Sequence, residues 1–426
     1  MQITFLSIDF ARIEPFLKFQ YSQYQANANA QFRALDFNNA QQLEEIHTCC
    51  QSWEELRQKN EFATRYNDSQ AFLRTLAHYK SGDREVPFAV LFSNAQTQAC
   101  LVGWLEQRSV SYALGPLKFK SLKMRCIKLP ETAILCDDQP ETWGAITTYF
   151  QALLKYVDYL EVPNLLRSHQ MFQHITGLVS SHGSYVLEPK VRWRTQLLEP
   201  TTGKPLQHRS SKTRSNLRRK EKRLAEEVGS LQLVKVQAKP QVDEFLDHAL
   251  EIASQTYQAA LADVGVSDTQ EYRTFLHIMA QEGMLRGYLL MAGSTPIAYV
   301  LGDVCFKTFT LWATSFVPQY SQRSPGIVMM CKVQEDLAKE GIVMFDFGWG
   351  DAEYKRVLSS EKQDEADIRI YAHRLKPTLA YWMDRSLSNL QRQLKAMLQS
   401  TGLFHRAREY WRAWLQGNQQ KTAVNS

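Results

Sequence analysis

The stretch MFDFGWGDAEYK, residues 344–355, ends an apolar run with more polar chemistry than a buried strand end needs. The run from Gly341 to Phe345 is typical of a strand. Two aspartates, two glycines, a tyrosine and a lysine follow, among other residues, although a turn requires only the glycines. The stretch therefore brings enough titratable groups to one strand end for acid–base chemistry.

The two-residue period of a strand predicts which side chains share a face at this point. It sends Phe345 and Phe347 to one face and Asp346 to the other. Three side chains then project near the carboxyl end of the strand, namely Asp351, Tyr354 and Lys355. A glycine turn with a surface ion pair is the simpler interpretation of each residue alone. Their combination in one corner favours a functional site.

The segment SQRSPGIVMM, residues 321–330, predicts the start of a helix before this strand. Ser324 suits the N-cap, Pro325 the first helical position and Gly341 the position after the helix. A helix start presents unpaired N–H groups and a partial positive charge, and Gly326 lets an anion approach the backbone closely. The segment therefore predicts an anion site, with a plain capped connection as the alternative.

The strand LWATSFVP, residues 311–318, precedes that helix and ends at Pro318, which cannot donate to a ladder. If this strand splays from its neighbour, free backbone groups lie beside the helix start. An edge strand that ends in a turn is the equal alternative.

A strongly basic helix is predicted around KTRSNLRRKEKRL, residues 212–224. Residues 204–223 hold nine basic residues against Glu221 alone, a net charge of +8. Leu217, Leu224 and Val228 form its packing face, and the basic residues form rows at i, i+4 spacing. Such runs are most often solvated faces, but a nearby anion would better explain the repulsion within each row.

Length and composition favour two domains with real cores, because the chain has 426 residues, 44% hydrophobic and 22% charged. Seven cysteines without a CxxC spacing and ten scattered histidines argue against a metal site or a disulfide framework. We expect no signal peptide and no membrane-spanning helix, and hence a cytoplasmic protein.

The C-terminal residues 376–426 carry eight basic residues and two acids, a net charge of +6, and show helical apolar repeats. Packing against the protein's own core is the favoured interpretation. The tryptophans and the charge also suit a helix on an anionic membrane, so peripheral contact through residues 400–416 is a second expectation.

Residues 88–105 and 288–304 share an apolar strand, a polar turn, a second apolar strand and a glycine near its end. Helices precede each hairpin, and a helix and a strand follow it. This weak repeat predicts a tandem of two related mixed α/β domains.

Four segments together resemble the GNAT acyltransferase superfamily, and more closely the tandem-GNAT proteins of the CelD/BcsL and FemAB-like group. The resemblance covers roughly residues 85–375 and is sharpest in the basic helix, FVPQYSQRSPGIVM and FDFGWGDAEYK. It implies an α/β fold with a mixed sheet, built from a degenerate first domain (1–190), a catalytic second domain (191–375) and a basic helical tail (376–426).

The same resemblance implies that the second domain binds acetyl-CoA or another acyl-CoA. The GNAT pyrophosphate loop, Arg/Gln-x-x-Gly-x-Gly/Ala, is met by Arg323 and Gly326 but departs at Val328. The implied cofactor-binding residues are Ser315, Phe316, Val317, Arg323, Ser324, Gly326 and Ile327. Asp351 would be the base or orient the amine, Tyr354 would be the acid, and Lys355 would stabilise the tetrahedral anion or anchor a phosphate. The implied substrate-binding residues are Arg214, Asn216, Arg218 and Trp349.

The function implied is N-acyl transfer, most simply acetyl transfer, to a sugar amine, polysaccharide or cell-envelope precursor at the inner face of the membrane. A Fem-like aminoacyltransferase that uses aminoacyl-tRNA is the alternative, since the basic helix would suit tRNA phosphates. Against it, residues 240–285 contain no long coiled-coil arm. A non-catalytic module that binds anions is the third interpretation.

Overall fold

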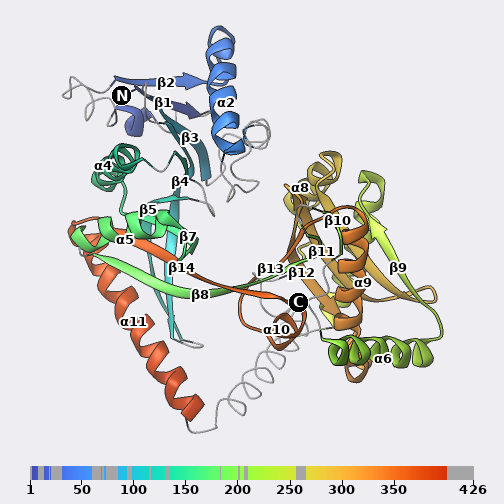
Figure 1. Ribbon diagram of the computed structural model, residues 1–426. Coiled ribbons are helices and arrows are strands. Elements are labelled where there is room, and N and C mark those ends of the chain that lie inside the picture. Colours follow the sequence, from blue (N-terminus) through green and yellow to red (C-terminus); the bar gives the residue numbers. More distant parts are fainter. Residues whose placement is uncertain are drawn as a thin grey trace. The chain divides into compact units, whose positions relative to one another are not determined.

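The structure is a computed structural model, and its description covers most of the chain. The residues described are 2–7, 14–18, 20, 31–59, 69, 72, 85–93, 98–114, 117–129, 134–137, 139–182, 184–199, 202–205, 210–255 and 265–400. The chain divides into two compact units, residues 1–190 with 364–396 and residues 191–363 with 397–426. Each unit is described by itself (Figure 1).

The first unit is a mixed sheet with helices packed on it. Its sheet runs in the order β2 (Gln31–Asp36), β1 (Gln2–Ser7), β3 (Glu85–Ser93), β4 (Gln98–Leu114), β5 (Leu117–Lys128), β7 (Tyr159–Leu166) and β14 (Glu361–Tyr371), and β6 (Ile134–Cys136) also pairs with β4. The helices are η1 (Ala40–Gln42), α2 (Leu43–Gln58), α4 (Pro140–Tyr156), α5 (Gln170–His182) and α11 (Leu375–Ser400).

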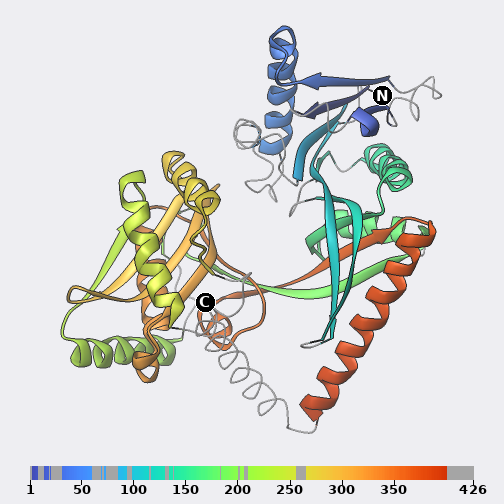
Figure 2. The ribbon, with the colours of Figure 1, turned by 180° about the vertical axis from the view of Figure 1, so that it is seen from behind.

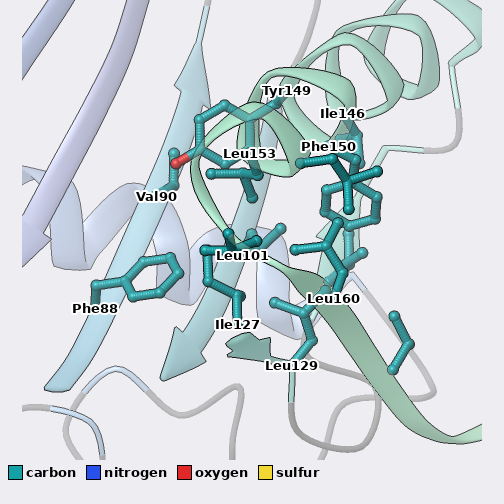
Figure 3. Packing of buried hydrophobic residues seen from close by; sticks show 14 of the residues in the cluster. Phe88, Val90, Leu101, Ile127, Leu129, Ile146, Tyr149, Phe150, Leu153 and Leu160 are labelled. Carbon is teal, nitrogen blue, oxygen red and sulfur yellow. The ribbon is translucent and has the colours of Figure 1, made fainter. Parts of the chain in front are cut away.

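The core of the first unit forms where α4 covers the sheet (Figure 3). Phe150 and Leu153 of α4 are buried against Val90, Leu101 and Ile127, which lie on β3, β4 and β5. Full burial of such a side chain contributes about 1.5–3 kcal/mol. The apolar face of α4 therefore explains its position on the sheet.

The second unit carries the segments that the sequence singled out. Its sheet runs in the order β8 (Tyr185–Gln196), β13 (Met344–Trp349), β12 (Thr308–Phe316), β11 (Thr295–Cys305), β10 (Leu285–Ala292) and β9 (Leu231–Val236). The helices are α6 (Ser211–Val228), η3 (Lys239–Gln241), α7 (Val242–Ser254), α8 (Gln270–Gln281), η5 (Pro318–Arg323), α9 (Pro325–Lys339) and α10 (Glu353–Leu358).

Two apolar clusters divide the helices of the second unit between the faces of its sheet. One cluster joins Leu224 of α6 and Val333 of α9 to Phe345 and Phe347 of β13. The other joins α7 and α8 to the opposite side of β10, β11 and β12. Figure 2 shows this unit from behind. The predicted alternation of Phe345 and Phe347 against Asp346 is confirmed.

The mixed α/β fold class is confirmed, and the two units share a strand order. The predicted hairpin repeats are β3–β4 and β10–β11. In each unit the next strand pairs antiparallel with the hairpin, a helix follows, and a strand then returns parallel. In both helices a proline occupies the first turn.

The end of the second unit differs from the predicted boundary at residue 375. Residues 364–396 pack with the first unit, because β14 pairs antiparallel with β7 from Glu365 to Tyr371. The local sequence of β14 does not indicate which strand it pairs with. The strands β1, β2 and β6 and the helices α5 and α10 were not predicted. Residues 401–426, which include most of the predicted membrane contact at 400–416, lie outside the described part.

Candidate active site

The centre of the candidate site is a split between the two parallel strands β12 and β13. They pair only from Thr308 to Thr310, opposite Met344 to Asp346, although β12 continues to Phe316. Directly after the paired segment, β12 has a register shift against β11, where Leu301 faces Ala313 and Gly302 faces Leu311. Of the two alternatives considered for this strand, the structure therefore shows the one in which it splays from its neighbour.

The backbone of β12 beyond the split has one paired and one open edge. The Val317 N–H donates to Ile297 O at 2.9 Å, so Ser315, two residues earlier, also turns its backbone toward β11. Thr314 and Phe316 alternate with them and turn their N–H and C=O groups toward the split. Of the predicted strand residues, Phe316 thus presents its backbone to the site. Thr314 does so as well, whereas Ser315 and Val317 do not.

The start of α9 differs from the predicted cap. Ser324 has a left-handed backbone, φ 56° and ψ 50°, and its side chain makes no capping bond. Instead its carbonyl oxygen accepts from the N–H groups of Ile327 (3.1 Å) and Val328 (3.2 Å), and its own N–H donates to Ser321 O (3.1 Å). A left-handed non-glycine residue costs on the order of 1–3 kcal/mol, and such strain clusters at functional sites.

Gly326 is the residue of this first turn that joins the helix start to the split. Pro325 has no N–H, and no backbone acceptor for the Gly326 N–H is found among the described residues. A Cβ built on Gly326 would lie 3.2 Å from Cδ1 of Phe316. The helix start and the open strand edge are therefore neighbours, as the sequence predicted. The N–H groups of Ser324, Ile327 and Val328 are already bonded, so fewer N–H groups face an anion at this helix start than the sequence suggests.

The basic helix α6 lies against the same helix start. Leu224 is fully buried, and Leu217 and Val228 pack partly buried beside it, as predicted. Two ion pairs hold the helix, from Glu227 to Arg323 and from Glu221 to Lys332 of α9. Arg323, predicted to bind pyrophosphate, is thus paired with a carboxylate, and Ile327 packs partly buried on the core.

The predicted substrate-binding residues of α6 have different environments. Arg214 is half-buried, whereas Asn216 and Arg218 are exposed. Asn216 Oδ1 accepts from Nη2 of Arg219 at 3.0 Å. These side chains lie on the N-terminal half of α6, whereas the ion pairs above come from Glu221 and Glu227 on its C-terminal half.

The strand end itself leads into a short helix, α10, which the sequence analysis missed. Asp351 precedes α10, and its Oδ1 lies 2.7 Å from Nε of Arg356. The hydrogen bond from Arg356 lowers the pKa of Asp351 below its ordinary value. Tyr354 packs the edge of its ring against Phe347, with centroids 6.3 Å apart. Trp349, at the strand end, is 56% exposed.

Lys355 is buried and turned back onto the strand end. Its Nζ donates to the carbonyl oxygens of Trp349 (2.7 Å) and Gly348 (3.4 Å), and only 8% of the residue is exposed. Burial lowers the pKa of Lys355 to about 8. A group that holds backbone carbonyls in this way positions the glycine turn, so the predicted contact with a tetrahedral anion is not what this structure shows.

Asp346 forms a buried ionic cluster that the sequence analysis did not single out. It is 1% exposed, and its Oδ2 lies 2.7 Å from Nη1 of Arg192 and 2.9 Å from Nε of Arg194, both on β8. Its Oδ1 accepts from the Gly348 N–H at 2.7 Å. Burial raises the pKa of Asp346, but these partners outweigh it and lower the pKa. The alternating arginines in the sequence VRWR, residues 191–194, were the signal from which this cluster could have been predicted.

The features described above all border the split between β12 and β13. Gly348 passes close to β12, since a Cβ at Gly348 would lie 3.7 Å from Leu311 O. The strand end, the open edge of β12, the start of α9 and the helix α6 are thus linked by direct contacts within one unit. Among the described residues, no cluster of side chains could hold a metal ion.

Residues 211–356 match the family model of the acetyltransferase (GNAT) domain. The match begins at the first residue of α6 and ends within α10, so it contains every predicted site residue. No curated protein matches the chain.

Three similar solved structures cover most of the chain at low identity. The C-terminal domain assigned to a lysylphosphatidylglycerol synthetase from Agrobacterium fabrum is 10% identical, with a TM-score of 0.47, over 80% of this chain and 97% of that one. FemX is 9% identical, with a TM-score of 0.46, over 67% and 88%. A GCN5-related N-acetyltransferase from Kribbella flavida is 8% identical, with a TM-score of 0.35, over 76% and 69%.

Proposed function

We propose that the second unit is an N-acyltransferase that moves an acyl group from acyl-CoA to an amine. The observation that carries this proposal is the open edge of β12 beside the start of α9. An extended donor can pair with the edge while its phosphates face the helix N-terminus. The family match at 211–356 supports the same reaction class.

The donor would use groups that are present in this unit. The amides of a pantetheine arm would pair with the backbone of Thr314 and Phe316, as a neighbouring strand does. The pyrophosphate would accept from the Gly326 N–H and interact with the dipole of α9. Arg323 would exchange its pairing with Glu227 for a phosphate, because both are anions within reach of one guanidinium.

The corresponding helix start in the first unit is occupied by a carboxylate. Asp137 Oδ1 accepts from the Gln139 N–H (3.2 Å) and from Oγ1 of Thr142 (2.6 Å) at the start of α4. A fixed negative charge there would repel a phosphate. This supports one donor site per chain, in the second unit, and a first unit that does not bind the donor.

In the reaction the amine nitrogen attacks the thioester carbon, a C–N bond forms and the C–S bond breaks. A β12 N–H at the split would stabilise the oxyanion of the tetrahedral intermediate. Asp351, ionised at neutral pH, would orient the amine, whose nitrogen would lose its proton to solvent water as the C–N bond forms. Tyr354 would donate a proton to the leaving thiolate and regain one from water. Lys355 would act indirectly by holding the turn at Gly348.

The acceptor would bind at the exposed strand end. The indole of Trp349 offers a flat apolar surface for a sugar ring, and the exposed Arg218 offers charge for a phosphate or uronate. Arg214 and Asn216 would extend that surface. We therefore propose an amino sugar, polysaccharide or cell-envelope precursor as acceptor, at the inner face of the membrane.

One observation favours aminoacyl-tRNA as an alternative donor. The acids Glu221 and Glu227 of α6 pair inward with Lys332 and Arg323, whereas Arg218, Arg219 and Arg223 are exposed. The third acid of α6, Glu226, is exposed and pairs with Lys222. An outer face on which one acid stands among several arginines suits a polyphosphate backbone.

Thermal unfolding of the full chain with separate ligands tests the assignment. Acetyl-CoA is expected to raise the melting temperature, since a ligand that binds only the folded state stabilises it. A rise with charged tRNA but not with acetyl-CoA would favour the alternative. A rise with neither would contradict both donors and leave an anion-binding module.

A further inference from the structure

Helix α11 of the first unit has two opposite apolar faces, of which one is used inside the unit. Ala380 and Tyr381 are buried against Met124, Tyr159 and Tyr371 of the sheet. The other face carries large apolar side chains that remain in solvent. This second face is not explained by the fold or by the proposed reaction.

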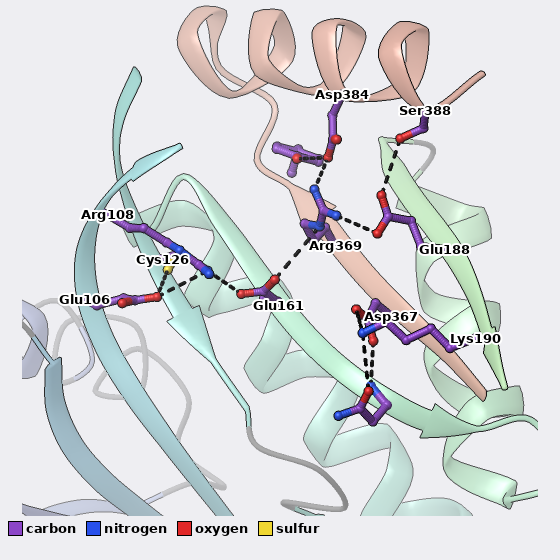
Figure 4. A network of polar contacts seen from close by, with 12 residues as sticks. Glu106, Arg108, Cys126, Glu161, Glu188, Lys190, Asp367, Arg369, Asp384 and Ser388 are labelled. Carbon is purple, nitrogen blue, oxygen red and sulfur yellow. Dashed lines mark hydrogen bonds and ion pairs between the residues drawn. The ribbon is translucent and has the colours of Figure 1, made fainter. Parts of the chain in front are cut away.

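The inner face is fixed by a polar network (Figure 4). Asp384 of α11 is 7% exposed, pairs with Arg369 of β14 and accepts from Oη of Tyr371 at 2.6 Å. Arg369 also pairs with Glu188 at 2.9 Å, and Ser388 of α11 donates to Glu188 at 3.4 Å. The network holds the orientation of α11, so its outer face has a defined direction.

The outer face is an apolar row at helical spacing. Leu375 is 90% exposed, Leu379 55%, Trp382 56% and Leu390 40%. At 3.6 residues per turn these four side chains share one side of the helix, opposite Ala380 and Asp384. Four large exposed apolar residues in one row mark an interaction surface.

The charges of α11 select the kind of surface that this row fits. Its one acid, Asp384, is buried in the network, and its basic residues are Lys376, Arg385, Arg392 and Lys395. Lys376 and Arg385 are exposed and lie on either side of the apolar row. Lys376 also pairs with Asp158, and Arg385 donates to the hydroxyl of Tyr381, so contact with lipid phosphates would compete with these partners. An apolar row with flanking cations and an exposed tryptophan is the pattern of a helix that lies on an anionic bilayer.

We propose that the outer face of α11 docks the protein on an anionic lipid surface. Leu375, Leu379 and Trp382 enter the boundary between headgroups and acyl chains, and Lys376 and Arg385 contact lipid phosphates. Among the described residues, no helix is long and apolar enough to cross a bilayer, so this contact lies along the surface. Docking concerns the first unit and does not depend on the reaction of the second.

Co-sedimentation with vesicles tests the proposal. Full-length protein is expected to pellet with vesicles of phosphatidylcholine and phosphatidylglycerol, and to remain in solution with phosphatidylcholine alone. The double variant Leu379→Gln with Trp382→Gln is expected to lose binding by about tenfold or more, because apolar burial is removed. Both positions are exposed, so folding is expected to persist, as circular dichroism would show.

A matched control is Leu43→Gln on α2 of the same unit, where the leucine is 45% exposed. This variant is expected to bind vesicles like the unchanged protein. Equal binding by the double variant, or no binding of the unchanged protein to anionic vesicles, would overturn the proposal. Sedimentation velocity without lipid tests the alternative that a second copy of the chain packs on this face. A dimer that the double variant abolishes, together with absent vesicle binding, would assign the face to a second copy of the chain.

Discussion

Asp346 Oδ2 and Arg192 Nη1 lie 2.7 Å apart, and fewer than 5% of either residue is exposed to solvent. The pair joins β13 to β8 where β13 parts from β12. The same carboxylate receives the Gly348 N–H, so it also fixes the first glycine of the strand end. The ionic cluster therefore holds the geometry of the split from the side away from β12.

Asp346→Asn is expected to lower the free energy of unfolding by about 3–5 kcal/mol, because it leaves two guanidiniums without a compensating buried charge. Urea unfolding measures the change. Asp351→Asn is the control, since its ion pair with Arg356 is exposed to solvent, where screening leaves such a pair little effect on stability. Similar losses for both variants would show that the buried cluster has no special structural role.

The lowered pKa of Asp346 also makes the free energy of unfolding depend on pH. A carboxyl with a lowered folded-state pKa contributes stability above its unfolded pKa and loses it as the pH falls through the folded value.

Lys355 is expected to give a slope of the same sign at alkaline pH. Its folded pKa is about 8 and the ordinary value is 10.5, so the unfolded chain binds more protons between these values. The contribution of Lys355 to stability therefore rises with pH from about 8 to about 10.5. Unfolding free energies across this range, compared with those of Lys355→Met, measure it. A variant with the same slope as the unchanged protein would contradict the burial of an ammonium here.

Tyr354→Phe is expected to lower kcat about 10²–10⁴-fold with little change in melting temperature, if the phenol protonates the leaving thiolate. Asp351→Asn is expected to act mainly on the KM for the amine, because the carboxylate is ion-paired and weakly basic. Steady-state kinetics on an identified acceptor separate the two effects. Full activity of both variants would show that Tyr354 and Asp351 have no part in the reaction.

Replacing Arg214 and Arg218 by Gln is expected to weaken binding of an anionic substrate and to flatten its salt dependence. Lys339→Gln, at the far end of α9 and exposed, is the control for net charge. A salt dependence that stays the same in the double variant would show that these arginines do not contact the substrate.

The sequence predicted those features that local chemistry determines. Pro325 marks the start of α9 and Gly341 the position just after its end, as predicted. Gly341 has the left-handed φ of 82° expected at that position. The alternation around Asp346 was also predictable. Features that depend on partners far away in the sequence could not be predicted. Arg192 lies 154 residues from Asp346, and β14 returns to β7 across the whole second unit.

The cap of α9 shows a different limit of sequence reasoning. Ser324 stands at the predicted position, but it uses its carbonyl oxygen instead of its hydroxyl. Residue preferences predict the position of a cap, whereas the backbone conformation decides which atom serves it. The roles of Asp351 and Lys355 shift for a similar reason, since their partners, Arg356 and the strand-end carbonyls, depend on the helix α10.

The central claim is that the start of α9, at Gly326, receives the phosphates of an acyl-CoA beside the open edge of β12. Calorimetric titration of the full chain with CoA tests it most directly. We predict one site per chain and loss of binding in Gly326→Asp, where a negative charge faces the pyrophosphate. Gly326→Asn separates charge from volume, and Gly144→Asp, where an added Cβ has no neighbour within 4 Å, controls for the added charge. Unchanged affinity of Gly326→Asp for CoA, with the fold intact, would contradict the account.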